Sequence, residues 1–404
     1  MKIVKSLRHC LGVIKRKIKL SYELKYHSIT YSIINKPYEC FEIYKTLKPE
    51  SWENTVITET YNLNKKTIYS GWSERLDILL LDNAIVKNRT DIVITDKGCL
   101  LDKAENPNFG GMILEDVDLL RHSRNELTLR NTKEKEFIDG KVVSLLGIFS
   151  TLWAHFIIQF LPKLLIAIEK GILLDKEVVI LVPFYKDNQI REIISIYADR
   201  YPHVTIKIAD DKYSYVCKKL YYIPSLTVQV NQAAYIHPHF CVFTNLMKDL
   251  LSKHFIDLFV EKANQLVTPV YSKIYLPRVG YHRTIVNHEE VDQYFKNNGF
   301  EFIYPDKLSL LEKIRIFNNA DIIAGPLSGG FTNAFFCRKN AKILGFSNIP
   351  RTLESYLGSI STINSIQVLS VTGYDLDGRN IHTSYYIPLE RIIKAYNYLL
   401  TNTL

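Results

Sequence analysis

Several familiar features are missing from this sequence, and each absence narrows what the protein can be. No run of about eighteen uncharged apolar residues occurs, and no apolar leader precedes a small-residue cleavage site, so we expect the chain neither to span a membrane nor to be secreted. The six cysteines are dispersed without a C-x-x-C pair, which argues against a disulfide framework or a zinc cluster and favours a reducing cytosol. Internal repeats and low-complexity tracts are also absent.

What remains is the composition of an ordinary globular protein. Hydrophobic residues make up 47% of the chain and charged residues 23%, which is enough apolar material for sizeable cores. A length of 404 residues exceeds what one core usually organises. Two domains of roughly 150 to 250 residues are therefore expected.

The net charge of +9 is concentrated at the amino terminus. Residues 1–20 hold seven Lys and Arg and no acid. On a helix, their apolar side chains fall within one arc and their basic side chains fill the opposite side, as in helices that lie on an anionic membrane surface. The alternative is a helix packed on the domain with a lysine-rich outer face. Nucleic acid is not an expected partner, because no basic patch interleaved with aromatic residues recurs downstream.

The pattern along the chain predicts an α/β fold. Residues 55–105 alternate short apolar runs with Asn, Asp and Gly turns, which is typical of antiparallel strands and indicates a β-rich lobe. From about residue 142, helical and strand periods alternate, which predicts parallel α/β structure. Residues 237–264 are expected to form a long amphipathic helix that could join two lobes. We expect two Rossmann-like, doubly wound domains that face a cleft. The expected segments are a basic helix 1–20, an N-terminal lobe 21–265 and a C-terminal α/β domain 266–404.

A glycine loop in the sequence "IIAGPLSGGFTNAFF", residues 322–336, is a candidate anion site. It lies between a predicted strand and a predicted helix, where backbone N–H groups and the helix dipole favour negative charge. It matches neither the P-loop nor the dinucleotide-binding fingerprint. A tight connection that needs glycine for steric reasons is the alternative.

Basic and polar residues of the same half could complete this site. Arg278 ends a predicted strand, and Arg283 lies five residues further on. Arginines near a diphosphate would neutralise the charge that develops on a leaving group. Each of them could instead form a surface ion pair. Asn287 is a plausible cap for the helix that follows, and Ser309 with Glu312 forms a capping box for the next one.

His155 is the candidate general base. It lies in the apolar helix "LWAHFIIQFLPKL", where a lone histidine is more often a satisfied core residue than a base. The pair His237 and His239 has no third ligand at suitable spacing, so no metal site is expected.

Taken together, these segments resemble glycosyltransferase family 61. The similarity spans about residues 75 to 350. Its segments are the stretch Leu81 to Asp102, the helix His155 to Leu164 with its histidine, the group Arg278, Arg283, Asn287 and Glu289, and the glycine loop Gly325 to Phe336.

The resemblance implies a GT-B fold and a metal-independent, inverting transfer of a sugar from a nucleoside diphosphate to a hydroxyl, without a cofactor. Residues 266–404 would be the donor domain, and the preceding lobe would face the acceptor. Expected partners are a nucleotide sugar and a saccharide or lipid-linked glycan acceptor, in bacterial capsule, exopolysaccharide or lipopolysaccharide synthesis. Residues 1–20 would then hold a cytoplasmic enzyme at the inner face of the membrane. His155 would be the base. Gln159, Asn287 and Glu289 are further candidate site residues without an assigned role. The donor diphosphate would contact Arg278, Arg283, Ser328, Gly329, Gly330, Thr332 and Asn333.

The chain also departs from the family pattern. Leu327 and Ser328 replace a histidine and a glycine of the loop, Gln159 replaces an acid, and Gly345 replaces the acid that usually ends the next strand. Three hypotheses follow: a transferase with a divergent site, a degenerate member that binds polysaccharide or lipid-linked precursors as a scaffold, and a nucleotide- or phosphate-dependent enzyme of another class. Nucleotide binding separates the first two.

Overall fold

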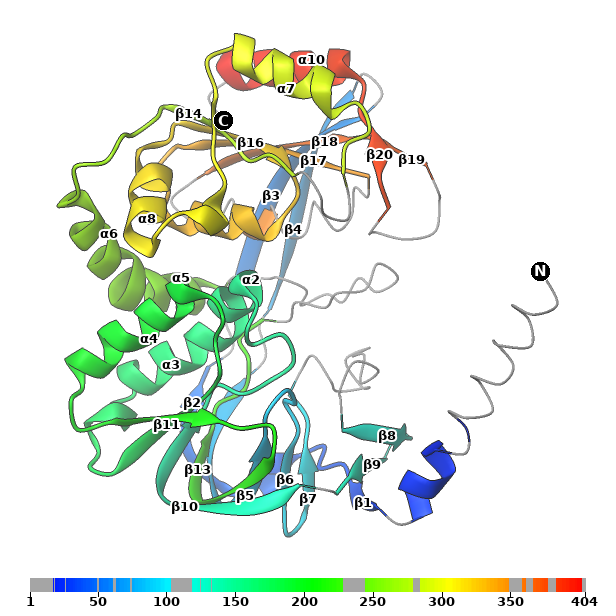
Figure 1. Cartoon of the computed structure of the whole chain (residues 1–404), viewed down its shortest axis with the longest axis vertical. Helices are drawn as coiled ribbons and strands as arrows, with labels where there is room; N and C mark the ends of the chain where they lie inside the picture. The colour runs from blue at the N-terminus through cyan, green and yellow to red at the C-terminus, as the bar shows by residue number, and fades with distance from the viewer. Residues whose placement is uncertain are drawn as a thin grey trace.

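The structure is a computed structural model, and it describes most of the chain. The described residues are 17, 19–25, 27–48, 51–60, 63–72, 75–102, 118–123, 125–131, 133–227, 244–278, 284–348, 358–360, 366–376 and 383–401, with only the backbone described in 51–60 and 63–72. The fold is mixed α/β with several sheets, which confirms the predicted class (Figure 1).

The first large sheet, called the N-terminal sheet, combines parallel and antiparallel pairs. Its parallel part runs in the order β12, β11, β10, β13, and β5, β6 and β7 follow as antiparallel neighbours, while β2 also pairs with β5. The bounds are β2 Glu42–Leu47, β5 Leu76–Lys87, β6 Val93–Thr95, β7 Gly98–Leu100, β10 Glu134–Ser144, β11 Val178–Pro183, β12 Thr205–Ala209 and β13 Tyr213–Tyr222. The parallel α/β structure predicted from about residue 142 is confirmed for β10 to β13, and β5 joins this part antiparallel through β13.

The second large sheet, called the C-terminal sheet, is parallel from β15 through β14, β16, β17 and β18 to β3, and β4 closes it antiparallel. The bounds are β14 Lys273–Tyr275, β15 Glu301–Phe302, β16 Ile322–Pro326, β17 Lys342–Ser347 and β18 Gln367–Thr372. The alternation of strands and helices predicted after residue 265 is confirmed. A two-stranded sheet of β19, Tyr374–Asp375, and β20, Tyr385–Tyr386, lies beside it.

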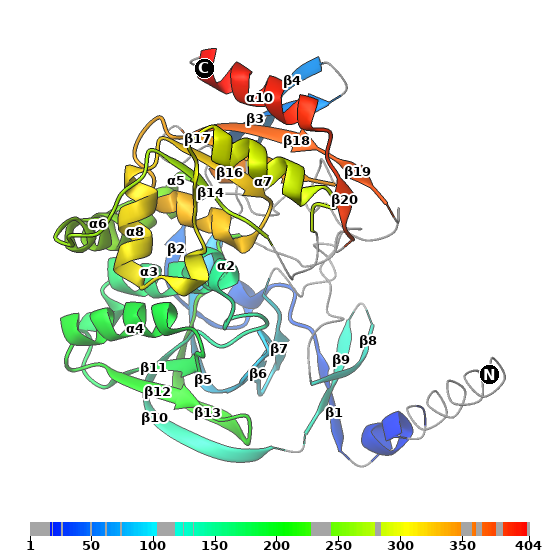
Figure 2. The same ribbon diagram turned by 45° about the horizontal axis from the view of Figure 1, so that its top comes forward.

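The β-rich segment 55–105 does not form one lobe. The hairpin of β3, Ser51–Thr60, and β4, Leu63–Trp72, pairs with β18, whereas β5 to β7 belong to the N-terminal sheet. The chain thus crosses from one sheet to the other and returns, as the blue strands show (Figures 1 and 2). Strand formation was predictable here, but the partner of the hairpin was not. The domain boundaries predicted at residues 20 and 265 remain a prediction.

Helices fill the space between the two sheets and cover the outer side of the C-terminal sheet (Figure 1). Facing the N-terminal sheet are α2 Trp153–His155, the π-helical turn η4 Phe156–Phe160, α3 Leu161–Glu169, η5 Ile172–Leu174 and α4 Asn188–Arg200. Next come α5 Asn245–Leu251, η6 Ser252–Ile256, α6 Asp257–Asn264, η7 Pro305–Lys307, α8 Leu310–Asn319 and η8 Gly329–Phe336. On the outer side lie α7 His288–Asn297 and α10 Leu389–Thr401.

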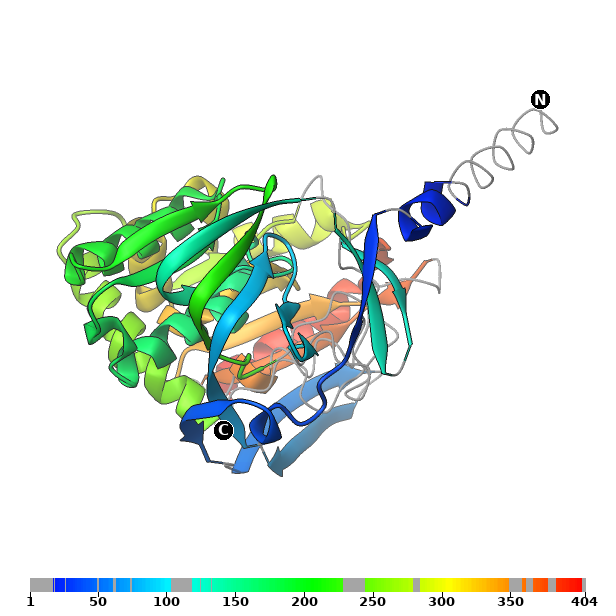
Figure 3. The same ribbon diagram turned by 90° about the horizontal axis from the view of Figure 1, so that it is seen from below.

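One hydrophobic core continues across the two halves. It includes Phe156 and Ile190 from the first half and Phe317 and Phe336 from the second, all fully buried. The rings of Phe255 and Phe336 lie 5.4 Å apart between centroids. The opposite face of the N-terminal sheet has a separate core, and none of the helices that the structure describes covers it, as the view from below shows (Figure 3). The doubly wound arrangement predicted for both halves therefore holds best for the C-terminal sheet.

The predicted amino-terminal helix lies mostly outside the described residues. Residues 19–25 are helical, and Glu23 accepts a hydrogen bond from Arg130 of β9 at 3.1 Å. The small sheet at this point consists of β1 Ser28–Ser32, β9 Glu126–Arg130 and β8 Leu119–His122, and η1 Pro37–Glu39 follows it. Among the described residues no helix is long and apolar enough to cross a membrane. Membrane association of residues 1–20 remains a prediction.

Candidate functional site

The glycine loop follows β16 directly, as predicted. Gly325 has φ +151°, and a Cβ there would lie 2.5 Å from the backbone oxygen of Leu276, so only glycine lets β14 and β16 approach this closely. Ser328 caps η8 by accepting a hydrogen bond from the Gly330 N–H. η8 is a tight 3₁₀ helix that ends at Phe336, shorter than the predicted helix, because Cys337 is extended and Asn340 has φ +65°.

The two glycines at the start of η8 lie near other elements, at distances where even a Cβ would make only ordinary contacts with them. A Cβ on Gly329 would lie 3.4 Å from the Cβ of Ala154 in α2, and one on Gly330 would lie 3.7 Å from Cγ of Pro305. Gly329 itself is exposed. The loop is therefore bordered by α2 from the first half and by the start of η7 from the second.

Arg278 lies at this loop, as the sequence predicted. Its Nη1 donates a hydrogen bond to the carbonyl oxygen of Leu327 at 3.3 Å, and its side chain is half-buried. A guanidinium beside an exposed glycine and a helix start is a suitable arrangement for an anion. Arg283 lies outside the described residues.

His155 ends α2, next to the alanine that touches the glycine loop. Its Nδ1 lies 2.7 Å from Oε1 of Gln159, and its ring lies 4.9 Å from that of Phe149. Because a carboxamide oxygen only accepts, Nδ1 carries the proton and Nε2 has the lone pair that a base needs. Burial lowers the pKa of His155 to about 4, although the hydrogen bond to Gln159 acts in the opposite direction. The imidazole is therefore neutral at pH 7. The π-helical turn after it places Gln159 beneath it, and such turns are frequent at functional sites.

Other predicted site residues have mainly structural contacts. Asn333 is buried and donates from Nδ2 to the carbonyl of Gly330 at 2.8 Å, so it supports the loop from below, and Thr332 is buried beside it. Asn287 occupies the N-cap position of α7, but its side chain does not cap the helix and instead bonds Glu290 and both backbone atoms of Ile387. The prediction that Asn287 caps this helix is wrong, because the backbone of Ile387 offers its side chain two hydrogen bonds.

Two further predictions on helix starts can be placed. Glu289 is exposed in the first turn of α7, where a carboxylate stabilises the helix dipole. The capping box of Ser309 and Glu312 is confirmed at the start of α8.

Sequence reasoning missed a buried polar cluster that joins the two halves beside the site. The Lys313 amine of α8 lies 3.0 Å from the ring centroid of Trp153 in α2 and bonds Oε1 of Gln189 in α4. Gln189 in turn donates from Nε2 to the carbonyls of Pro305, at 2.9 Å, and Leu308, at 2.5 Å. Burial holds the pKa of Lys313 well below its usual range. The only sequence signal was a lysine on the apolar face of the predicted helix.

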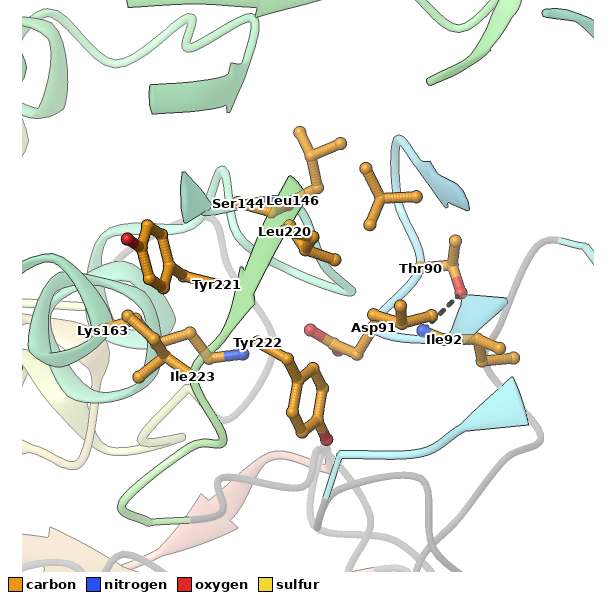
Figure 4. A pocket seen from close by; sticks show the side chains of 12 residues that line it. Thr90, Asp91, Ile92, Ser144, Leu146, Lys163, Leu220, Tyr221, Tyr222 and Ile223 are labelled. Carbon is orange, nitrogen blue, oxygen red and sulfur yellow. Dashed lines mark hydrogen bonds between the residues drawn. The ribbon is translucent and has the colours of Figure 1, made fainter. Parts of the chain in front are cut away.

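A second buried cluster anchors α3, the continuation of the site helix. Lys163 donates to Asp102 at 2.7 Å, and the same carboxylate accepts from the hydroxyl of Ser225 at 2.6 Å. Burial alone would raise the pKa of Asp102, but the Lys163 charge and these hydrogen bonds lower it below its ordinary value. Next to this cluster is a cavity of about 30 Å³, large enough for a water molecule, into which Lys163 and Asp91 reach from opposite sides (Figure 4).

Three buried polar atoms around the site have no hydrogen-bond partner among the described residues: Trp153 Nε1, Tyr185 OH and Asn333 Oδ1. An unpaired buried polar group costs about 1 to 3 kcal/mol, so such groups are rare and can serve a bound molecule. In the described part of the chain, no cluster of three or more His, Cys, Asp or Glu could hold a metal ion. The arrangement offers a neutral imidazole, a guanidinium and an exposed helix start within adjacent elements.

Comparison with known proteins shows that this region is similar to one family. The family model described as Glycosyltransferase 61 matches residues 153–344, slightly less than half of the chain. The match begins at α2 and ends in β17, so it includes His155, Arg278 and the glycine loop. No curated protein matches the chain. Over residues 153–344, the chain is therefore similar to glycosyltransferase family 61.

Proposed function

We propose that this glycosyltransferase moves a sugar from a nucleoside-diphosphate sugar to a hydroxyl of a growing bacterial surface polysaccharide or glycolipid. The family match supports glycosyl transfer in general. The single observation that carries the donor assignment is Arg278, because its guanidinium lies at a glycine loop that opens a helix. A diphosphate leaving group needs this kind of charge compensation. We further propose a GT-B arrangement, with the C-terminal sheet as the donor side.

The proposed reaction is a direct, inverting displacement without a metal or cofactor. His155 Nε2 accepts the proton of the acceptor hydroxyl as the oxygen bonds to the anomeric carbon, and the bond to the diphosphate breaks. Arg278 and the Gly329 N–H, with Arg283 as a further candidate, stabilise the departing charge. Gln159 fixes the tautomer of His155 but, unlike a carboxylate, does not stabilise the imidazolium that forms.

The proposal also includes the place in the cell where the enzyme acts. Residues 1–20 would hold the enzyme on an anionic membrane surface in the cytoplasm, where a lipid-linked glycan acceptor is within reach. If deletion of these residues left membrane association unchanged, this part of the proposal would be wrong.

A thermal-shift titration against UDP, GDP, CMP and their sugar conjugates tests the donor assignment. A ligand that binds the folded state raises Tm with its occupancy. We expect one nucleotide class to stabilise the protein and Arg278→Ala to weaken its binding at least tenfold. Arg121→Ala, an exposed arginine of β8, is the matched control and should bind as the unaltered protein does.

If every nucleotide left Tm unchanged on a folded protein, the donor assignment would fail. The scaffold hypothesis would then explain the departures at Gln159 and Leu327 better. Glycolipid binding would be the property to measure next.

A further inference from the structure

A groove of about 590 Å³ lies between the two halves, next to the glycine loop. Its walls are the start of α4 and the segment from η7 to the start of α8. This volume lies within the range of ligand sites, about 300 to 1,000 Å³. The lining residues are Lys186, Asp187, Asn188, Gln189, Glu192, Asp306, Lys307, Leu308, Ser309 and Leu310.

The groove is connected to the site described above through Pro305. A Cβ on Gly330 would lie in ordinary contact with Cγ of Pro305, and the next two residues, Asp306 and Lys307, line the groove. Gln189 fixes the two walls together by its bonds to Pro305 and Leu308. The lining of the groove therefore begins one residue along the chain from Pro305, which borders the loop that is proposed to hold the donor diphosphate, and a buried bridge preorganises the groove.

The chemistry of the lining differs from that of the glycine loop. Two lysines face three carboxyl groups, so the lining carries a small excess of negative charge, whereas Arg278 makes the loop positive. Asp306 and Lys307 are exposed, and Glu192 is half-buried, which raises its pKa by desolvation. Asp187 caps α4, Ser309 bonds Glu312 and Gln189 is bonded within the bridge, so these lining groups are already engaged. The exposed carboxylate of Asp306 and the exposed amine of Lys307 supply an acceptor and a donor that match neutral sugar hydroxyls.

Exposed aromatic rings lie beside both walls in the sequence. Phe184 is 56% exposed and precedes the first wall, and Tyr304 is 39% exposed and precedes the second. The Lys307 amine lies 4.4 Å from the Tyr304 ring centroid, which places this ring next to a lining residue. Aromatic faces supply apolar contact area for the C–H faces of sugar rings.

We propose that this groove binds the acceptor, and that the acceptor is a neutral saccharide segment. The inference rests on the proposed function and narrows its acceptor. A phosphate-bearing lipid carrier would then extend beyond the groove, with only its sugar end between α4 and η7.

Saturation-transfer NMR tests the groove with neutral gluco-, galacto- and N-acetylglucosamine-containing trisaccharides as probes, beside the same sugars carrying a phosphate. The groove variant is Asp306→Ala with Lys307→Ala, and the control is Asp199→Ala with Lys339→Ala, a similarly exposed pair elsewhere. We expect at least one neutral trisaccharide to bind, a loss of tenfold or more in the groove variant, and no loss in the control. Nucleotide thermal shifts should be equal in both variants.

The remaining outcomes of this experiment either refute the acceptor groove or show that the groove and the donor assignment are independent. Equal glycan binding by the groove variant and the control, binding of phosphorylated probes only, or no glycan binding by a protein that binds nucleotide would each refute the groove. Groove-dependent glycan binding without any nucleotide shift would support the groove while the donor assignment fails.

Discussion

The neutral, buried state of His155 can be tested through the pH dependence of stability. In the unfolded chain this imidazole titrates near pH 6.5, and in the folded protein at about 4. Between these values the unfolded state binds more protons than the folded state, so stability falls as the pH falls. Each pKa unit corresponds to about 1.4 kcal/mol. The two pKa values therefore predict a loss of about 3 kcal/mol in total, of which roughly 2 kcal/mol falls between pH 7 and pH 4.5.

The assay compares urea unfolding of the unaltered protein and His155→Asn at several pH values. Asparagine keeps a donor near the Nδ1 position for Gln159 but does not titrate. The unaltered protein should lose roughly 2 kcal/mol more than the variant between pH 7 and pH 4.5. Other acid-sensitive groups, such as Glu169 with its pKa lowered to about 2 by hydrogen bonds from Lys253 and His254, are present in both proteins and cancel.

A direct NMR titration of the His155 ring gives a second measurement that does not depend on the variant folding. We expect it to remain neutral to about pH 5. Gln159→Glu should raise this pKa, because a carboxylate favours the imidazolium, and should raise kcat if His155 is the base. Equal pH slopes in the two proteins, or a ring that titrates near pH 6.5, would refute the reasoning.

Two further predictions concern the free energy of unfolding. Gly325→Ala should lower it by about 3 kcal/mol or more in urea unfolding, because the new Cβ would lie 2.5 Å from the Leu276 backbone oxygen and φ is +151°. The control Gly299→Ala should lower it by about 1 kcal/mol, because φ is +75° there and nothing lies within 4 Å of the new Cβ. Equal losses in the two variants would contradict the contact argument. Lys313→Met should keep the free energy of unfolding at pH 7 within about 1 kcal/mol of the unaltered protein. In the unaltered protein this free energy should rise as the pH increases toward 10.5, because the pKa of Lys313 is lowered in the folded state and the unfolded state therefore binds more protons in that pH range. The variant should not show this rise. A variant that unfolds at pH 7, or that keeps the slope, would show that the amine is charged and required beside Trp153.

Local patterns in the sequence determined much of the fold and the centre of the site. The alternation of strands and helices, the capping box of Ser309 and the strand before the glycine loop are all present where predicted. These features depend on residues within one or two turns of each other, so one sequence is sufficient to find them. Arg278 was predictable from the parallel strand order, because the end of β14 and the end of β16 meet at one edge of a parallel sheet.

Contacts between distant segments were decided only by the tertiary structure. Nothing in residues 51–72 indicates that Ile57 pairs with Leu369, or that β5 runs opposite to β13. The same holds for the bridge of Lys313, Gln189 and Trp153, whose members come from three helices. Pairing register and side-chain contacts across the halves depend on the packing of the whole core, whereas periodicity reports only which face of each element is buried. The sequence therefore predicted which residues to consider for the candidate site, and the tertiary structure determined which elements surround them.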